Sequence, residues 1–204
     1  MAMAKYLIGV VVFVVVATGA YYAWQALGTS LVPPPEEEEA TTMSTYATTT
    51  FSVTYPSTYT VNDAYTYDEF KGKPIAGVKF TVPAAATEGT NLSSDTGISV
   101  EWLPRAKTCT GDIYILANVK AVSLMVGSTT YSVATTSGAA AGNLYEEQVY
   151  AISGSKPCTA VRYFIHSGNI GNFTQEGESS TREFDRTALL REFDEIRNSL
   201  LLSQ

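Results

Sequence analysis

A small polar set in the last third of the chain contains the residue types that could carry out chemistry. His166 is the only histidine, and an imidazole can gain or lose a proton near neutral pH. If the segment around it is a strand, Arg162, Phe164 and His166 share one face. Glu146 or Glu147, from the preceding segment, could then lie close to Arg162. This set predicts either a polar binding cluster on a sheet or an acid–base pair of His166 with a nearby carboxylate.

The polar set favours binding over catalysis. A lone histidine at a strand end is more often a structural hydrogen-bonding residue than a catalyst. An arginine beside a glutamate is most often a cross-strand ion pair worth about 0.2–1 kcal/mol. The compact polar loop that follows the strand adds two asparagines. We therefore expect a binding surface, and no catalytic residue, from the following side chains: Glu146, Arg162, His166, Asn169 and Asn172.

Familiar catalytic and cofactor motifs are missing from the sequence. It contains no P-loop, no Gly-x-Gly-x-x-Gly, no His-Glu-x-x-His, no aspartate-rich calcium loop and no Gly-x-Ser-x-Gly elbow. Two cysteines and one histidine without close spacing make a poor zinc site. We therefore expect no metal and no cofactor.

The two cysteines, Cys109 and Cys158, are candidates for a disulfide. Outside the cytoplasm, two thiols in one domain tend to pair. The bridge would close a loop of about 50 residues and stabilise the fold by roughly 4 kcal/mol in the chain-entropy model. Two buried free thiols are the alternative.

The uncharged run from Tyr6 to Ala26 predicts a membrane anchor. About twenty residues in a helix span a hydrocarbon core of roughly 30 Å. Lys5 precedes the run, whereas Glu36–Glu39 follow it, and the positive-inside rule then places the N-terminus in the cytoplasm. We expect a single-pass protein of the cell membrane with its C-terminal domain outside. A cleaved signal peptide is the alternative, because small residues occur at Thr18–Ala20.

Composition divides the rest of the chain into a linker and one domain. Residues 1–5 form the predicted cytoplasmic tail, and residues 27–50, rich in Pro, Glu and Thr, read as an extended spacer. Residues 51–204 are long enough for one domain with its own core. The net charge is −7, and no basic stripe stands out, so nucleic acid is not an expected partner.

Period-two alternation predicts strands in most of the domain. A terminal amphipathic helix begins near Arg186, with Asp185 as its N-cap. Its apolar stripe is Leu189, Phe193, Ile196 and Leu200. The small residues 137–142 read as a mobile loop. The predicted strands are 51–55, 58–61, 77–82, 98–102, 122–126, 129–133, 144–152 and 159–167, with 109–120 undecided between strand and helix.

The domain resembles the PsbP/Mog1-like family. The resemblance rests on an opening strand that ends Thr-Tyr-Pro, a meander of strands and a final Phe-Asp-Glu-Ile-Arg-Asn-Ser-Leu helix. The segment 157–166 also looks like membrane-anchored, uncharacterised bacterial proteins of this type. The resemblance implies an α+β fold, with an antiparallel sheet packed by a C-terminal helix in an α-β-α sandwich.

Taken together, the sequence predicts an anchored binding or assembly module without catalytic activity, with a protein partner in the cell envelope. The exposed sheet face and loops 136–143 and 168–180 would contact that partner. The alternative is a cell-envelope hydrolase that uses His166 with a nearby carboxylate.

Overall fold

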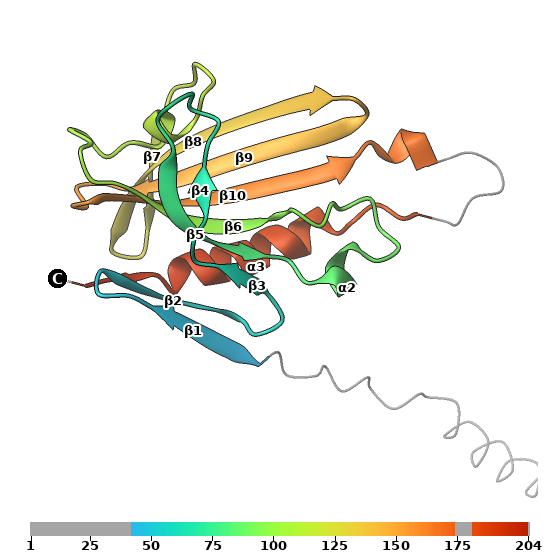
Figure 1. Ribbon diagram of the computed structural model, residues 1–204, viewed down its shortest axis with the longest axis horizontal. Coiled ribbons are helices and arrows are strands. Elements are labelled where there is room, and N and C mark those ends of the chain that lie inside the picture. The colour runs from blue at the N-terminus through green and yellow to red at the C-terminus, as the bar shows by residue number, and fades with distance from the viewer. Residues whose placement is uncertain (1–41, 174–180, 204) are drawn as a thin grey trace, which may run out of the picture. The chain divides into compact units, whose positions relative to one another are not determined.

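The computed structural model describes residues 42–173 and 181–203 (Figure 1). The predicted anchor at 6–26, the cytoplasmic tail and most of the predicted linker lie outside these residues. Within the described ranges, no helix is both long and apolar enough to cross a membrane.

Antiparallel strands make up most of the described chain. The short helices are α2 (Ala84–Thr87), η1 (Gly111–Tyr114) and η2 (Ile170–Phe173), and the long one is α3 (Arg186–Asn198). The strands are β1 (Met43–Ala47), β2 (Phe51–Pro56), β3 (Thr60–Asn62), β4 (Thr66–Tyr67), β5 (Ile75–Thr81), β6 (Gly97–Leu103), β7 (Val122–Val126), β8 (Thr129–Ala140), β9 (Asn143–Ile152), β10 (Cys158–Gly168) and β11 (Leu201–Leu202).

The strands form two sheets. The larger sheet has eight strands in the order β3-β5-β6-β10-β9-β8-β7, with β4 also paired to β5. The smaller sheet has the order β1-β2-β11. The predicted hairpin of segments 144–152 and 159–167 is confirmed as β9 and β10, which lie at the middle of the larger sheet with Arg162 opposite Val149. The predicted β7–β8 hairpin is also confirmed, and Gly127 takes the positive φ of 58° that its turn requires.

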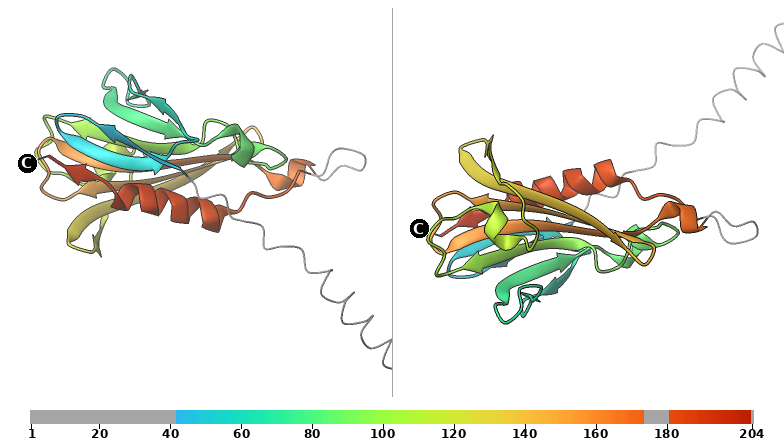
Figure 2. Two further views of the ribbon diagram at one scale, coloured as in Figure 1. Left: turned by 90° about the horizontal axis from the view of Figure 1, so that it is seen from below. Right: turned by 90° about the horizontal axis from the view of Figure 1, so that it is seen from above.

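The smaller sheet and α3 together cover one face of the larger sheet (Figures 1 and 2). The core between them contains Phe51 and Val53 of β2, Val161 and Tyr163 of β10, and Phe193 of α3. Alternation explains this packing, since every second residue of β10 points to the covered face. The opposite residues, among them Arg162, Phe164 and His166, lie on the other face.

Helix α3 begins and packs as its sequence predicts. The Asp185 carboxylate accepts a hydrogen bond from the Ala188 amide at 2.9 Å, which satisfies a donor that has no partner inside the helix. Leu189, Phe193 and Ile196 are buried. Leu200 lies beyond the end of the helix and is only partly buried.

The predicted fold class is wrong. The described chain is a mostly antiparallel β structure of two sheets, and it is not an α+β sandwich packed by a C-terminal helix. The alternating pattern of β2 predicted a strand, but it did not show that this strand belongs to a second sheet. It pairs instead with β1, from the predicted linker, and with the two-residue β11, which is too short to show any period. The described part of the chain also places no long helix on the second face, as an α-β-α arrangement would need.

A second apolar cluster lies on the other face of the large sheet, at the end where β10 begins. The segment between β6 and β7 folds over this end, and the buried Tyr114 and Ile115 pack on Val149 and Ala160. The predicted disulfide is confirmed, because the sulfur atoms of Cys109 and Cys158 lie at bonding distance and their Cα atoms are 5.1 Å apart. The bridge fastens this segment to β10.

The prediction of a mobile loop at 137–142 is wrong in its extent. Residues 137–140 continue β8 and pair with the start of β9, so that only Ala141 and Gly142 form the turn. Cross-strand hydrogen bonds override the weak strand propensity of Gly and Ala here. The end of the chain segment predicted as linker is likewise a strand, β1.

Candidate functional site

The central residue of the face opposite α3 is Arg162, on the most central strand of the large sheet. Its side chain is 1% exposed, and that of Glu101, on the neighbouring strand β6, is fully buried. Arg162 Nε donates to Glu101 Oε1 at 2.7 Å, and Nη2 donates to Oε2 at 2.9 Å. This two-point contact is the strongest geometry for a guanidinium and a carboxylate. Nη2 also donates to the Tyr114 carbonyl oxygen at 2.7 Å.

The third nitrogen of Arg162 reaches the edge of the cluster. Nη1 donates to Glu147 on β9, whose side chain is 16% exposed. The Tyr67 hydroxyl lies 3.3 Å from both oxygens of the same carboxylate. Glu101 is held in turn by the Ser99 hydroxyl, at 2.7 Å. Arg162 and Tyr67 therefore hold the Glu147 carboxylate in place, while its side chain remains partly exposed to solvent.

Protonation states follow from these contacts. Burial alone would lower the pKa of Arg162, but Glu101 and Glu147 together raise that pKa above its ordinary value. Burial is the largest cause that raises the pKa of Tyr67; Arg162 opposes this rise and Glu147 adds to it. At neutral pH the arginine is a cation and the Tyr67 hydroxyl keeps its proton, so the hydroxyl donates to Glu147.

A cleft of about 370 Å³ opens above Glu147. Tyr67 and Glu147 lie at its base, and Leu116, which is 63% exposed, lies at its rim. The remaining lining residues are Glu69, Ile115, Ala117, Thr136, Ser137, Gly138 and Tyr145. The cleft thus combines a fixed carboxylate, hydroxyl groups and an apolar rim, which are features of ligand sites.

His166 lies further along the same face. Its Nδ1 is 2.7 Å from Asp95 Oδ1, and its ring stacks on Tyr145 with the ring centroids 4.4 Å apart. Nε2 is buried and has no hydrogen-bond partner among the described residues. The nearby Lys79 ammonium lies 5.1 Å from the Phe164 ring centroid, and burial lowers the pKa of this lysine. The sequence-predicted carboxylate beside His166 is therefore Asp95.

The other predicted site residues lie apart from this cluster. Glu146 lies on the opposite face of β9 and pairs with Arg186 at 2.5 Å. The Asn169 amide and the Asn172 side-chain amide both donate to the Gly142 carbonyl oxygen, at 2.8 and 3.0 Å. These two asparagines join the loop after β10 to the β8–β9 turn. The structure brings together Arg162, Glu147 and, along the same face, His166, but not the remaining three.

Sequence reasoning missed Glu101, Tyr67 and Tyr114. Glu101 carried no local signal, because the alternation of segment 98–102 places it with Ser99 on a polar face, whereas the structure buries both side chains. Tyr67 belongs to a two-residue strand, which no periodicity reveals. In the part of the chain that the structure describes, no three His, Cys, Asp or Glu side chains are grouped so that they could hold a metal ion.

Comparisons with known proteins add little to this geometry. No protein-family model matches the sequence, and no curated protein matches it. A crystal structure of a protein from Bacteroides thetaiotaomicron VPI-5482 is similar with a TM-score of 0.39 and 13% sequence identity. The similarity covers 76% of this chain and 45% of that one, so this chain spans less than half of that protein. A likeness at this level carries no argument about function.

Proposed function

We propose that this protein is a membrane-anchored, extracytoplasmic binding module, and that its cleft takes a cationic side chain of a protein partner. The observation that carries the proposal is the state of Glu147, a carboxylate fixed by Arg162 and Tyr67 at the base of an open cleft. A carboxylate held in place before binding loses little freedom when a ligand arrives.

The charge balance of the cluster supports a cationic ligand. Among the side chains in direct contact, Arg162 supplies one positive charge to two carboxylates, those of Glu101 and Glu147. Glu69 at the rim adds a further negative charge. An ammonium or guanidinium group in the cleft would offset this excess in a partly buried setting, where charge pairs are stronger than in water. The exposed Leu116 would pack on the alkyl stem of a lysine or arginine.

The hydrolase alternative has less support. Asp95 and His166 form the carboxylate–histidine pair that it needs. However, within the described ranges no hydroxyl or thiol hydrogen-bonds to His166 Nε2, and nucleophilic catalysis requires such a neighbour. We therefore rank binding above hydrolysis.

The anchored topology is part of the proposal. It is supported by the uncharged run from Tyr6 to Ala26 and by the basic residue on its N-terminal side alone. Protease added to intact spheroplasts should degrade the domain, whereas complete protection behind an intact membrane would contradict this topology. The resemblance to the PsbP/Mog1-like family stays a prediction and carries no part of the argument.

The binding site can be mapped by nuclear magnetic resonance on the full-length protein in detergent micelles. The probe is Nα-acetyl-lysine amide, and Nα-acetyl-norleucine amide is the matched control, because it keeps the alkyl stem and lacks the ammonium group. We expect saturable amide shifts at Leu116, Ser137 and Tyr145 with the lysine probe and much smaller shifts with the control. Equal shifts with both probes, or shifts elsewhere alone, would exclude the proposed site.

A further inference from the structure

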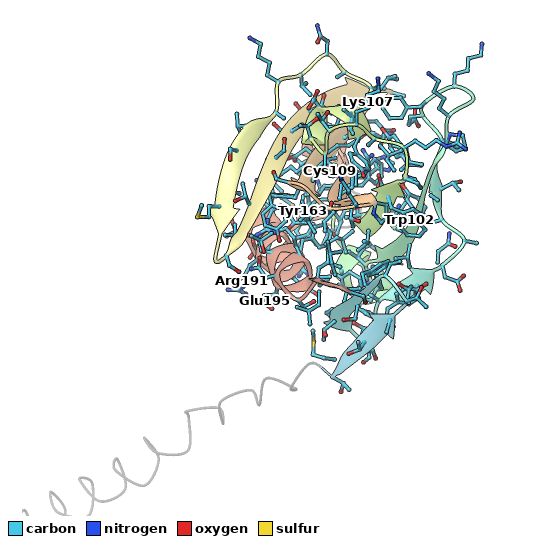
Figure 3. All side chains as sticks on the ribbon, turned by 90° about the vertical axis from the view of Figure 1, so that its left-hand side faces the viewer. Trp102, Lys107, Cys109, Tyr163, Arg191 and Glu195 are labelled. Atoms are coloured by element: carbon cyan, nitrogen blue, oxygen red, sulfur yellow. A yellow bond between two sulfur atoms is a disulfide. The ribbon has the colours of Figure 1, made fainter. Side chains whose placement is uncertain are left out.

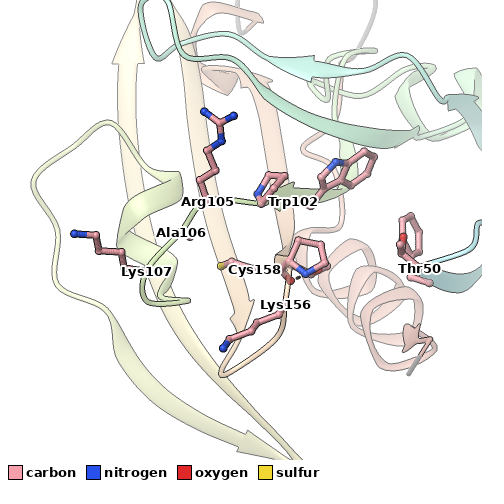
Figure 4. Close-up of a pocket in the computed structure, with 11 residues that line it drawn as sticks. Thr50, Trp102, Arg105, Ala106, Lys107, Lys156 and Cys158 are labelled. Carbon is pink, nitrogen blue, oxygen red and sulfur yellow. Dashed lines mark hydrogen bonds between the residues drawn. The ribbon is translucent and has the colours of Figure 1, made fainter.

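A second and larger cavity, of about 650 Å³, lies at the other end of the central strands (Figure 4). It is built where β6 ends and β10 begins, since Leu103 pairs with Cys158 at this point. It shares no lining residue with the cleft above Glu147. Its lining residues are Thr50, Phe51, Trp102, Pro104, Arg105, Ala106, Lys107, Lys156, Pro157, Cys158 and Thr159.

Three cations surround this cavity. Arg105 and Lys107 follow β6, and Lys156 precedes β10. All three are exposed, and among the described residues none of them makes an ion pair. No acidic side chain occurs among the described residues that line the cavity. This is a local positive site on a chain whose net charge is −7, and such a site attracts anions.

The floor of the cavity is apolar. The half-buried Trp102 indole and the Pro157 ring line it. The buried Phe51 also lines the cavity, and its ring contacts Trp102 with the ring centroids 6.2 Å apart. A large aromatic face next to polar groups favours a ligand that has one flat apolar surface.

The cavity wall is held in place by covalent and hydrogen-bonded contacts. The Cys109–Cys158 bridge fastens the segment that carries Arg105 and Lys107 to β10. The Thr159 amide donates to the Ser155 hydroxyl at 2.9 Å and closes the turn that carries Lys156. The backbone segments that carry the three cations are therefore held in place, as a preorganised site requires; Lys107 and Cys109 of the first segment are labelled in Figure 3.

The directions of the three cations indicate how the ligand's charge is distributed. In Figure 4 the Arg105, Lys107 and Lys156 side chains leave the cavity in different directions and do not converge on one point. A single phosphate, or the phosphate chain of a nucleotide, concentrates its charge and suits converging cations. Divergent cations suit a ligand whose acidic groups are spread over several units.

We propose that this cavity binds an acidic oligosaccharide, with one sugar ring packed on Trp102 and the carboxylates of neighbouring rings paired with Arg105, Lys107 and Lys156. The volume lies within the range of about 300–1,000 Å³ of small-molecule sites. Each carboxylate gains a charge-assisted hydrogen bond that neutral sugars cannot make. This inference does not depend on the cleft or its ligand.

Trp102 provides the readout. The chain has two tryptophans, so Trp24→Phe in the full-length protein leaves Trp102 as the sole indole. In this background, in detergent, trigalacturonate should change the indole emission saturably. The affinity should fall when the salt concentration rises, because exposed charge pairs are screened. Maltotriose, which has the rings without the charge, and pyrophosphate, which has the charge without the rings, should bind much more weakly.

Two double variants test whether trigalacturonate binds at this cavity. Lys107→Gln with Lys156→Gln should weaken trigalacturonate binding by about tenfold. Lys71→Gln with Lys73→Gln, at exposed positions outside the cavity, should leave it unchanged. The proposal is overturned by any of four results: no emission change, equal binding of maltotriose or pyrophosphate, equal loss in both double variants, or tighter binding of ATP than of trigalacturonate.

Discussion

The Arg162 guanidinium lies over the Tyr67 ring, with its Cζ atom 3.6 Å from the ring centroid. The same guanidinium binds Glu101 and Glu147 in its own plane. An arginine stacked on a ring and paired at its edge is fixed in both position and orientation. Through these contacts Arg162 holds Tyr67 and Glu147 in place at the base of the cleft.

The buried cluster makes a prediction about stability. Arg162→Met should lower the free energy of unfolding by about 3–5 kcal/mol, because it leaves Glu101 without a counter-charge in the interior. The double variant Arg162→Met with Glu101→Met should recover most of that loss, since the buried charge is then removed as well. Urea denaturation gives both values. A double variant that is no more stable than the single one would show that the pair itself is not the cause.

The sequence predicted only part of this cluster. Alternation placed Arg162, Phe164 and His166 on one face, and the structure confirms this arrangement. It could not choose between Glu146 and Glu147, because that choice depends on the register between β9 and β10. It also could not reveal Glu101, since that contact spans 61 residues and local periodicity says nothing about which strands become neighbours.

The apolar face of α3 is a second test. The fully buried Phe193 packs on Tyr163 with the ring centroids 5.3 Å apart. Phe193→Ala should therefore lower the free energy of unfolding by about 3–5 kcal/mol. Glu195→Ala, at an exposed position on the helix (Figure 3), should change stability by less than about 0.5 kcal/mol. Similar shifts of the denaturant midpoint in the two variants would contradict this packing.

Glu192, on the same helix, predicts a dependence on pH. Burial, with a contribution from Glu195, raises the pKa of Glu192 above its ordinary value of 4.5, although the Tyr59 hydroxyl opposes this rise. The folded state therefore holds this proton more tightly than the unfolded state, and its contribution to stability is lost as the pH rises through the raised pKa. The Glu192→Gln variant has no carboxyl group to ionise at this position, so its free energy of unfolding should not fall in this way.

The difference in unfolding free energy between Glu192→Gln and wild type isolates this group from all others. It should grow in favour of the variant as the pH rises above about 4.5, the ordinary pKa of this group. A difference that stays constant across this range would show that Glu192 titrates alike in both states.

The disulfide gives a fourth prediction. Cys109→Ala with Cys158→Ala should lower the free energy of unfolding by about 2–5 kcal/mol, because the bridge closes a long loop in the unfolded chain. Thiol labelling of the native wild-type protein should detect no free thiol before reduction and two after it. Two reactive thiols without reduction would be inconsistent with the bridge.

The fold illustrates what local patterns omit. The strands 51–55, 77–82 and 98–102 and the helix from Arg186 follow from periodicity and capping, which are local properties. The division of the strands into two sheets follows from which edges pair. That outcome depends on β1 and β11, one from the predicted linker and one of only two residues. Helix α3 shows the same limit, because Arg197 lies outside the predicted apolar stripe and is nevertheless buried, with its Cζ atom 4.3 Å from the Tyr150 ring centroid.

The central claim is that the cleft above Glu147 binds a cationic side chain. Its most direct test is the dissociation constant of Nα-acetyl-lysine amide for wild type and for Glu69→Gln, with Glu88→Gln as the control at an exposed position outside the cleft. Removing the rim charge should weaken binding about two- to fivefold, which corresponds to a partly screened pair of about 0.4–1 kcal/mol. Glu88→Gln should bind as wild type does. Equal dissociation constants for wild type and Glu69→Gln, or equal weakening in both variants, would contradict a cation site in this cleft.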